Sequence, residues 1–96
     1  MKISTSTRVD QIKTNIRIIR ERRNYTQDYL AMKMNISQNA YSKIELGYSK
    51  LTVAKLLEIC EILEIPFEDM IDPCINKVSY RLDYRPIIYR DLYKLN

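Results

Sequence analysis

The sequence lacks histidine and tryptophan and has only one glycine and two cysteines among its 96 residues. Histidine is the commonest general base and the commonest imidazole metal ligand, so its absence removes the usual starting points for an enzyme or a metal site. Cys60 and Cys74 form no C-x-x-C pair and cannot complete a four-ligand zinc site. We therefore expect no enzymatic activity, no metal and no cofactor. In a reducing cytosol we expect both cysteines as thiols, with Cys60 in the core.

The scarcity of turn-forming residues points to an all-α fold. One glycine and three prolines cannot supply the tight corners of a β-sandwich or barrel, whereas helices joined by short loops need few of them. Ninety-six residues suffice for one domain with short extensions. No stretch approaches the roughly 18 apolar residues of a membrane helix. Since residues 1–7 also lack the apolar core of a signal peptide, we expect a cytoplasmic protein.

Charge is unevenly distributed along the chain, whose net charge is +4. Residues 1–50 hold ten Lys/Arg against four Asp/Glu, residues 51–75 hold one against six, and residues 76–96 hold five against two. A polyanion would be attracted to the first half and repelled by the acidic middle. The pattern favours nucleic acid as a partner, although a balance of this size also occurs on a merely solvated face.

Start and stop signals predict five helices, of which the second and third, about 27–34 and 38–46, are the most sharply bounded. Each begins after a hydroxyl side chain that can cap it and ends before a residue that tolerates a left-handed backbone. The predicted caps are Thr26 and Ser37, and the predicted left-handed stops are Asn35 and Gly47.

The other three helices follow from apolar spacing and further caps. Thr7, with Asp10 in the capping-box position, is predicted to start the first, which ends at Asn24 and Tyr25. Thr52 is predicted to cap the fourth, and Pro66 fits the first turn of a short fifth. The side chains expected to face inward are Val9, Ile12, Ile16 and Ile19; Leu30, Ala31 and Met34; Val53, Leu56, Leu57, Cys60 and Leu63; and Phe67, Met70 and Ile71.

Two short helices joined by a three-residue turn form a helix-turn-helix arrangement, and the small Ala31 allows their close crossing. At this point the sequence resembles the phage repressor and Cro-type (XRE-like) family of helix-turn-helix regulators, over about residues 9–71. The matching motifs are Thr26-Gln27-x-x-Leu30-Ala31, Ile36-Ser37-Gln38, Ser42-Lys43-Ile44-Glu45-x-Gly47 and Leu56-Leu57-x-Ile59-Cys60-x-x-Leu63-x-Ile65, ending at Phe67. The departures are Asn35 for a turn glycine, Leu51 for a proline, and Tyr41 for Ile or Val. The ring of Tyr41 must pack while its hydroxyl finds water or a partner.

The resemblance implies a sequence-specific transcriptional regulator, a repressor by type, that binds double-stranded DNA as a homodimer. The helix at 38–46 would enter the major groove, and Arg20 and Glu45 would form a structural salt bridge. The residues expected to contact bases are Gln38, Asn39, Ser42 and Lys43. The residues expected to contact phosphates are Thr26, Gln27, Tyr48, Ser49 and Lys50.

Residues 73–96 lie outside the resemblance and form a C-terminal extension, after a flexible arm at 1–7 and the DNA-binding domain at 8–72. Apolar and aromatic residues alternate with polar ones, which predicts a strand whose free edge is most simply paired with a second copy of the chain. The residues expected at this dimer interface are Val78, Tyr80, Leu82 and Tyr84, together with Ile18, taken as exposed on the first helix. The alternatives are a tail folded onto its own domain and a largely disordered tail.

Two other functions remain open from the sequence. The chain could be the antitoxin of a toxin–antitoxin pair, with its tyrosine-rich tail binding a protein toxin. It could also be a protein-interaction module that has kept the fold and lost DNA binding, which the presence of Gln27, Gln38 and Lys43 argues against.

Overall fold

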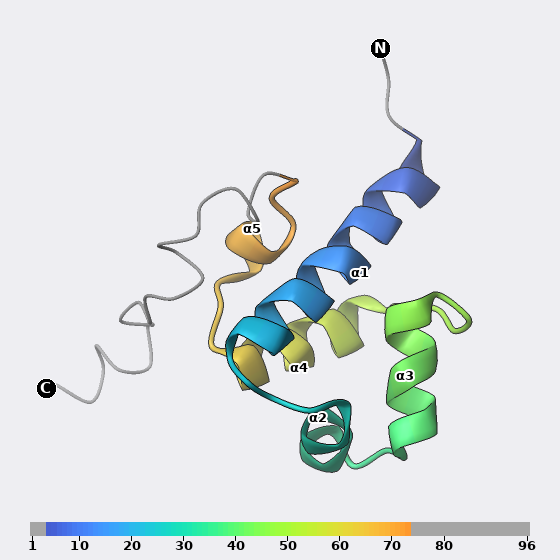
Figure 1. The fold of residues 1–96 in the computed structure, drawn as a ribbon. Coiled ribbons are helices and arrows are strands. Elements are labelled where there is room, and N and C mark those ends of the chain that lie inside the picture. Colours follow the sequence, from blue (N-terminus) through green and yellow to red (C-terminus); the bar gives the residue numbers. More distant parts are fainter. Residues whose placement is uncertain (1–3, 74–96) are drawn as a thin grey trace, which may run out of the picture.

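Residues 4–73 are described in a computed structural model of the protein, and their regular structure is entirely helical (Figure 1). The helices are α1 (Thr5–Arg22), α2 (Gln27–Met34), α3 (Gln38–Leu46), α4 (Val53–Leu63) and α5 (Phe67–Met70). Helix α1 packs against α3, α4 and α5, and α2 packs against α3 and α4. The all-α, five-helix prediction is confirmed. The predicted strand lies outside the described residues.

Local signals set the boundaries of α2, α3 and α4 where the sequence predicts them. Each helix follows a hydroxyl residue that accepts a hydrogen bond from the backbone N–H three residues later, at distances of 3.0, 3.0 and 3.1 Å. Asn35 (φ 58°) and Gly47 (φ 88°) adopt the left-handed conformation after α2 and α3. The capping residues are Thr26, Ser37 and Thr52.

Helix α1 begins earlier than predicted. Its cap is Ser4, whose hydroxyl accepts a hydrogen bond from the Thr7 N–H at 3.3 Å. The prediction of Thr7 as the cap is therefore wrong, and residues 5–7, assigned to a flexible arm, belong to the helix. Ser4 offers the same kind of acceptor one turn earlier, and neither proline nor glycine interrupts the residues between.

The core is formed by apolar side chains from all five helices and the loop before α5. The predicted burial is confirmed for Ile16 and Ile19 in α1 and for the three residues of α2 that were expected to face inward, Leu30, Ala31 and Met34. The buried apolar residues are Ile16, Ile19, Leu30, Ala31, Met34, Tyr41, Ile44, Leu56, Ile59, Cys60, Leu63, Ile65 and Met70. Burial raises the pKa of the Cys60 thiol to about 12, and the charge of Glu68 adds to that shift.

Four side chains predicted to face inward are exposed instead. Val53 and Leu57 lie on one edge of α4 with 68% and 50% of their surface accessible, because the buried stripe of α4 is centred on Ile59. In α5 only Met70 is buried, and Pro66 is the residue just before the helix. The other two exposed side chains are those of Phe67, in α5, and Ile71, directly after it.

A buried amide joins the middle of α1 to the end of the described chain. Asn15 lies among the core residues of α1, and its Nδ2 donates to the carbonyl oxygens of Met70 at 2.8 Å and Asp72 at 2.9 Å. The Oδ1 of Asn15 accepts from Gln11 at 3.0 Å. This side chain therefore attaches α5 to α1 by polar contacts with specific geometry.

Within residues 4–73, no helix has both the length and the hydropathy that crossing a bilayer requires. Nor do Cys, Asp and Glu side chains in this part of the chain gather in a group that could hold a metal ion.

Candidate nucleic-acid interface

The turn between α2 and α3 is fixed by backbone hydrogen bonds. The N–H of Asn35 donates to Met32 O at 3.1 Å, and that of Ile36 donates to Ala31 O at 3.0 Å. Ala31 is 1% exposed where α3 packs against α2. Small size at this position lets the two helices approach closely, which produces the helix-turn-helix geometry.

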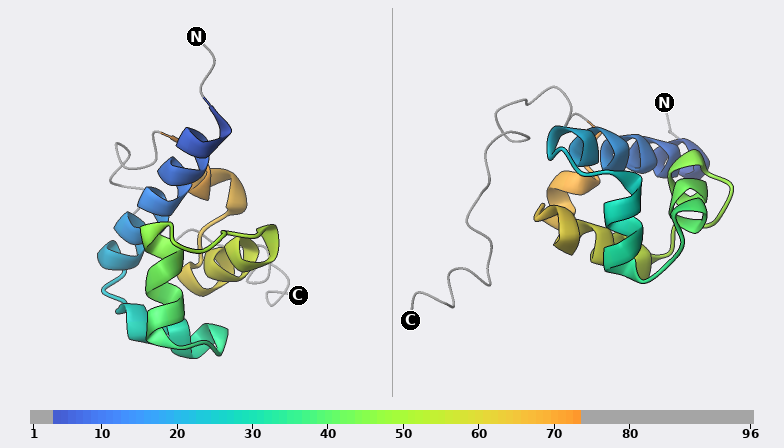
Figure 2. Two further views of the ribbon diagram at one scale, coloured as in Figure 1. Left: turned by 90° about the vertical axis from the view of Figure 1, so that its right-hand side faces the viewer. Right: turned by 60° about the horizontal axis from the view of Figure 1, so that its bottom comes forward.

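Helix α3 has a buried face and a free polar flank. Tyr41 and Ile44 are almost fully buried, whereas Gln38, Asn39 and Lys43 are exposed. Ser42 is half-buried. In Figure 1 and in the right view of Figure 2, α3 lies at one side of the helical body. Three of the four residues expected to contact bases therefore lie together on an accessible side of one helix.

The predicted salt bridge between Arg20 and Glu45 is present and two-pronged. Arg20 Nε donates to Glu45 Oε2 at 2.7 Å, and Arg20 Nη2 donates to Oε1 at 3.1 Å. The third guanidinium nitrogen, Nη1, donates to the carbonyl oxygen of Tyr25 at 2.9 Å. The side chains of Arg20 and Glu45 are 10% and 3% exposed, so the pair is largely removed from water and holds α1 against α3.

Two further residues bind the same carboxylate. The hydroxyl of Tyr41 donates to Glu45 Oε2, which supplies the partner that a tyrosine at this core position requires. The Nε2 of Gln27 donates to Glu45 Oε1 at 3.1 Å. Sequence reasoning missed this contact of Gln27. Glu45 therefore connects α1, the start of α2 and α3.

The pKa shifts follow from this arrangement. Burial alone would raise the pKa of the Glu45 carboxyl, but its three hydrogen-bonding neighbours and the positive charge of Arg20 outweigh burial and hold the pKa below its ordinary value. Burial lowers the pKa of Arg20, yet the hydrogen bonds and charge of Glu45 leave it raised. Burial raises the pKa of Tyr41, as do the hydrogen bond to Glu45 and its charge, so the hydroxyl stays protonated and donates.

The residues expected to contact phosphates flank the α2–α3 unit. Thr26 and Lys50 are exposed and Tyr48 is 79% exposed, while Gln27 is half-buried. Ser49 differs, because its hydroxyl oxygen is buried and has no hydrogen-bond partner among the described residues. The phosphate contact predicted for Ser49 stays a prediction, and burial of the hydroxyl weighs against it. The backbone N–H groups of Tyr48 and Ser49 both donate to Lys43 O, at 2.9 and 3.2 Å.

Of the residues expected at a dimer interface, only Ile18 lies in the described part of the chain. Ile18 is half-buried and packs against the core of its own chain, so its prediction as an exposed isoleucine is wrong. The side of α1 that meets the core is therefore wider than the stripe predicted from the apolar spacing. The predicted strand residues, Val78, Tyr80, Leu82 and Tyr84, lie outside the described part of the chain. Sequence reasoning missed a set of exposed apolar side chains near the end of α3 and along α4, namely Leu46, Tyr48, Val53 and Leu57.

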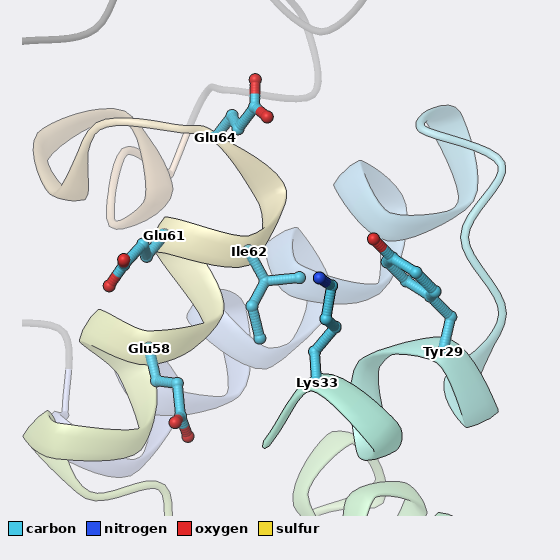
Figure 3. A pocket seen from close by; sticks show the side chains of 6 residues that line it. All are labelled: Tyr29, Lys33, Glu58, Glu61, Ile62 and Glu64. Carbon is cyan, nitrogen blue, oxygen red and sulfur yellow. The ribbon is translucent and has the colours of Figure 1, made fainter. Parts of the chain in front are cut away.

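A groove between α2 and α4 has the opposite electrostatic character to α3. It has a volume of about 300 Å³ and carries three glutamates and one lysine (Figure 3). The Lys33 ammonium lies 5.8 Å from the centre of the Tyr29 ring. Because its net charge is negative, this groove repels a polyanion. The lining residues are Tyr29, Lys33, Glu58, Glu61, Ile62 and Glu64.

Comparison with known proteins agrees with this geometry. A helix-turn-helix family model matches residues 16–70, more than half of the chain. No significant match is found among curated proteins or among solved structures. The matched segment contains the Arg20–Glu45 pair, both helices of the motif and the core of α4. The chain therefore belongs to the XRE-like helix-turn-helix family, and it is a DNA-binding regulator of transcription.

Proposed function

We propose that the protein is a cytoplasmic, sequence-specific repressor that binds double-stranded DNA as a homodimer and reads it with α3 in the major groove. The observation that carries this proposal is the polar flank of α3, exposed on a helix whose opposite face is fixed in the core. A groove-binding helix needs this combination, because its base contacts must project from a rigid support.

The flank has chemistry suited to base edges. The amides of Gln38 and Asn39 can each pair bidentately with adenine, and Lys43 can donate to O6 and N7 of guanine. Ser42 is half-buried and is the weakest candidate of the four. In the proposed complex these residues select sequence, while contacts elsewhere set the position of the protein on the duplex.

The proposed phosphate contacts come from both ends of the motif. Thr26 and Gln27 stand at the start of α2, where unpaired backbone N–H groups and the helix dipole favour an anion. Tyr48 and Lys50 follow α3 and are exposed. Together the two groups would contact the backbone on either side of the groove that α3 occupies.

Dimerisation would supply the affinity that one helix lacks. A single recognition helix reads only a few base pairs, so two copies on half-sites about one helical turn apart would raise both affinity and selectivity. The exposed apolar residues Val53 and Leu57, one turn apart on α4, and Leu46 at the end of α3 would gain from contact with a second copy. The strand predicted from Val78 to Tyr84 would extend such an interface.

The direct test is selection of bound sequences from a random DNA pool, followed by fluorescence anisotropy with the selected duplex at two salt concentrations. We expect a palindromic site, and affinity that falls steeply with salt because bound Lys and Arg release counterions. Lys43→Ala should relax base preference, whereas Lys50→Ala should weaken binding to all sequences alike. Absence of binding at low salt would contradict the proposal, and identical behaviour of the two variants would contradict the division of roles.

A second candidate is the antitoxin of a toxin–antitoxin pair. It is favoured by the tyrosine-rich segment beyond residue 73, which lies outside the matched residues 16–70. In that case the chain would co-purify with the product of a neighbouring small reading frame through residues 74–96. Deleting residues 74–96 should abolish this co-purification, and a complex that survives the deletion would contradict this candidate.

A further inference from the structure

The Glu45 carboxylate uses its full capacity as an acceptor. Two hydrogen bonds reach each oxygen: Arg20 Nε and the Tyr41 hydroxyl at Oε2, and Arg20 Nη2 and Gln27 Nε2 at Oε1. An ionised carboxylate has about four such sites and can only accept. Each donor that binds Glu45 therefore helps to fix its position for the other two residues.

This contact also fixes the orientation of the Gln27 amide. Because Glu45 only accepts, Gln27 must present its nitrogen to it and turn its oxygen away. The amide nitrogen carries two hydrogens and donates one of them to Glu45, and the second has no acceptor among the described residues. Gln27 is the first residue of α2, so its amide lies at the helix end whose backbone N–H groups favour an anion, although the carboxylate of Asp28 in the same turn opposes this.

Tyr41 adds a constraint that an aliphatic residue could not supply. Its ring is fully buried, so its hydroxyl cannot turn to solvent and must be satisfied within the protein. The raised pKa keeps this hydroxyl a donor at neutral pH. Tyr41 and Glu45 lie one turn apart on α3, so the carboxylate is tied to the same helix that presents the polar flank.

We propose that Tyr41 and Glu45 are positioning residues for DNA binding: through the Glu45 carboxylate they hold the Gln27 amide with its second N–H toward a backbone phosphate. The phosphate contact at the start of α2 is thereby set by the recognition helix itself. This inference rests on the proposed function, because it requires that Gln27 contact DNA. Neither Tyr41 nor Glu45 touches DNA in this arrangement.

A double-mutant cycle separates positioning from a purely structural role. Tyr41→Phe keeps the ring and removes only the donor, and Gln27→Met keeps the shape of the side chain and removes its amide. Tyr41→Phe should weaken binding to the selected duplex by roughly three- to tenfold, the effect of losing one hydrogen bond of ordinary strength, because the variant loosens the Gln27 contact but does not remove it. It should have no further effect in the Gln27→Met background. In the Lys50→Ala background, the matched control, its full effect should persist.

Two results of the double-mutant cycle overturn the inference. Equal weakening by Tyr41→Phe in all three backgrounds would mean that the hydroxyl only stabilises the fold, and no weakening in the otherwise unchanged protein would mean that it does not position Gln27. If the unchanged protein itself binds no DNA at low salt, the proposed function fails together with the inference.

Nuclear magnetic resonance without DNA gives an independent check. Tyr41→Phe should shift the side-chain amide resonances of Gln27 and leave those of Gln38 unchanged. Unchanged Gln27 resonances would contradict the proposed coupling.

Discussion

Replacing Glu45 by glutamine is the sharpest test of how the motif is held together. The substitution keeps the shape of the side chain and removes its charge, which leaves the Arg20 guanidinium buried with only the carbonyl of Tyr25 as a strong partner. Removing one member of a buried ion pair costs about 3–5 kcal/mol, because the other charge is left uncompensated. Since glutamine still offers one acceptor oxygen, we expect a loss near the lower end, about 3 kcal/mol.

Urea unfolding followed by helical circular dichroism measures this loss directly. A decrease of 3 kcal/mol lowers the melting temperature of a domain of this size by roughly 12–24 °C. Adding Arg20→Met to Glu45→Gln should recover part of the lost stability, because no buried cation then remains. A loss below about 1 kcal/mol, the range of solvent-exposed pairs, would refute the reasoning that this pair is removed from water.

The stability that Glu45 contributes should depend on pH. The folded pKa of Glu45 lies below its unfolded value of 4.5, so ionisation of Glu45 contributes stability that is complete above that value. The contribution is lost as the pH falls through the folded pKa. The difference in unfolding free energy between the unchanged protein and Glu45→Gln should therefore be constant between about pH 6 and 8 and should narrow in acid. A difference that widens in acid would reverse the assigned sign.

Three further predictions concern other parts of the fold. Asn15→Leu removes the donor to two carbonyl oxygens and should lower the unfolding free energy by about 2 kcal/mol. Backbone amides of α5 should then exchange their hydrogens faster, and unchanged exchange would mean that Asn15 does not attach α5 to α1. Gly47→Ala places a side chain at a φ of 88° and should lower stability in thermal unfolding by about 1 kcal/mol or more, whereas Asn35→Gly should change it little. A larger loss for Asn35→Gly than for Gly47→Ala would contradict the role assigned to the left-handed backbone. Cys60, with its thiol pKa raised to about 12, should resist thiol reagents until the protein is unfolded, and rapid labelling of the native protein would place it at the surface.

The signals that the sequence carries reliably are local ones. A capping hydroxyl and a residue that tolerates positive φ act within one turn, so Thr26 to Gly47 could be divided into helix, turn and helix from the residues alone. Where two equivalent signals compete, as Ser4 and Thr7 do at the start of α1, local reasoning has no means of choosing. The resemblance to a known family predicted the Arg20–Glu45 pair, which no local signal indicates.

Contacts between helices account for the remainder. The buried side of α4 depends on how α1 and α2 pack against it. The apolar spacing alone therefore assigned Val53 and Leu57 to the core and left out Ile59, which is fully buried. The hydrogen bond from Gln27 to Glu45 joins residues 18 positions apart and depends on the crossing of α2 and α3. A polar residue within an apolar stripe was the available signal for Asn15, since it lies three residues after Ile12 and four before Ile19.

The amide of Asn15 also has a consequence for the order in which the protein is made. Its acceptors lie 55 and 57 residues further along the chain. At about 5–20 residues per second, the ribosome delivers them on the order of 3–11 s after Asn15 itself. Until then the Nδ2 of Asn15 lacks the two acceptors that it has in the folded domain. The two helices of the helix-turn-helix, α2 and α3, are therefore synthesised in full before the contact between α1 and residues 70–72 can form.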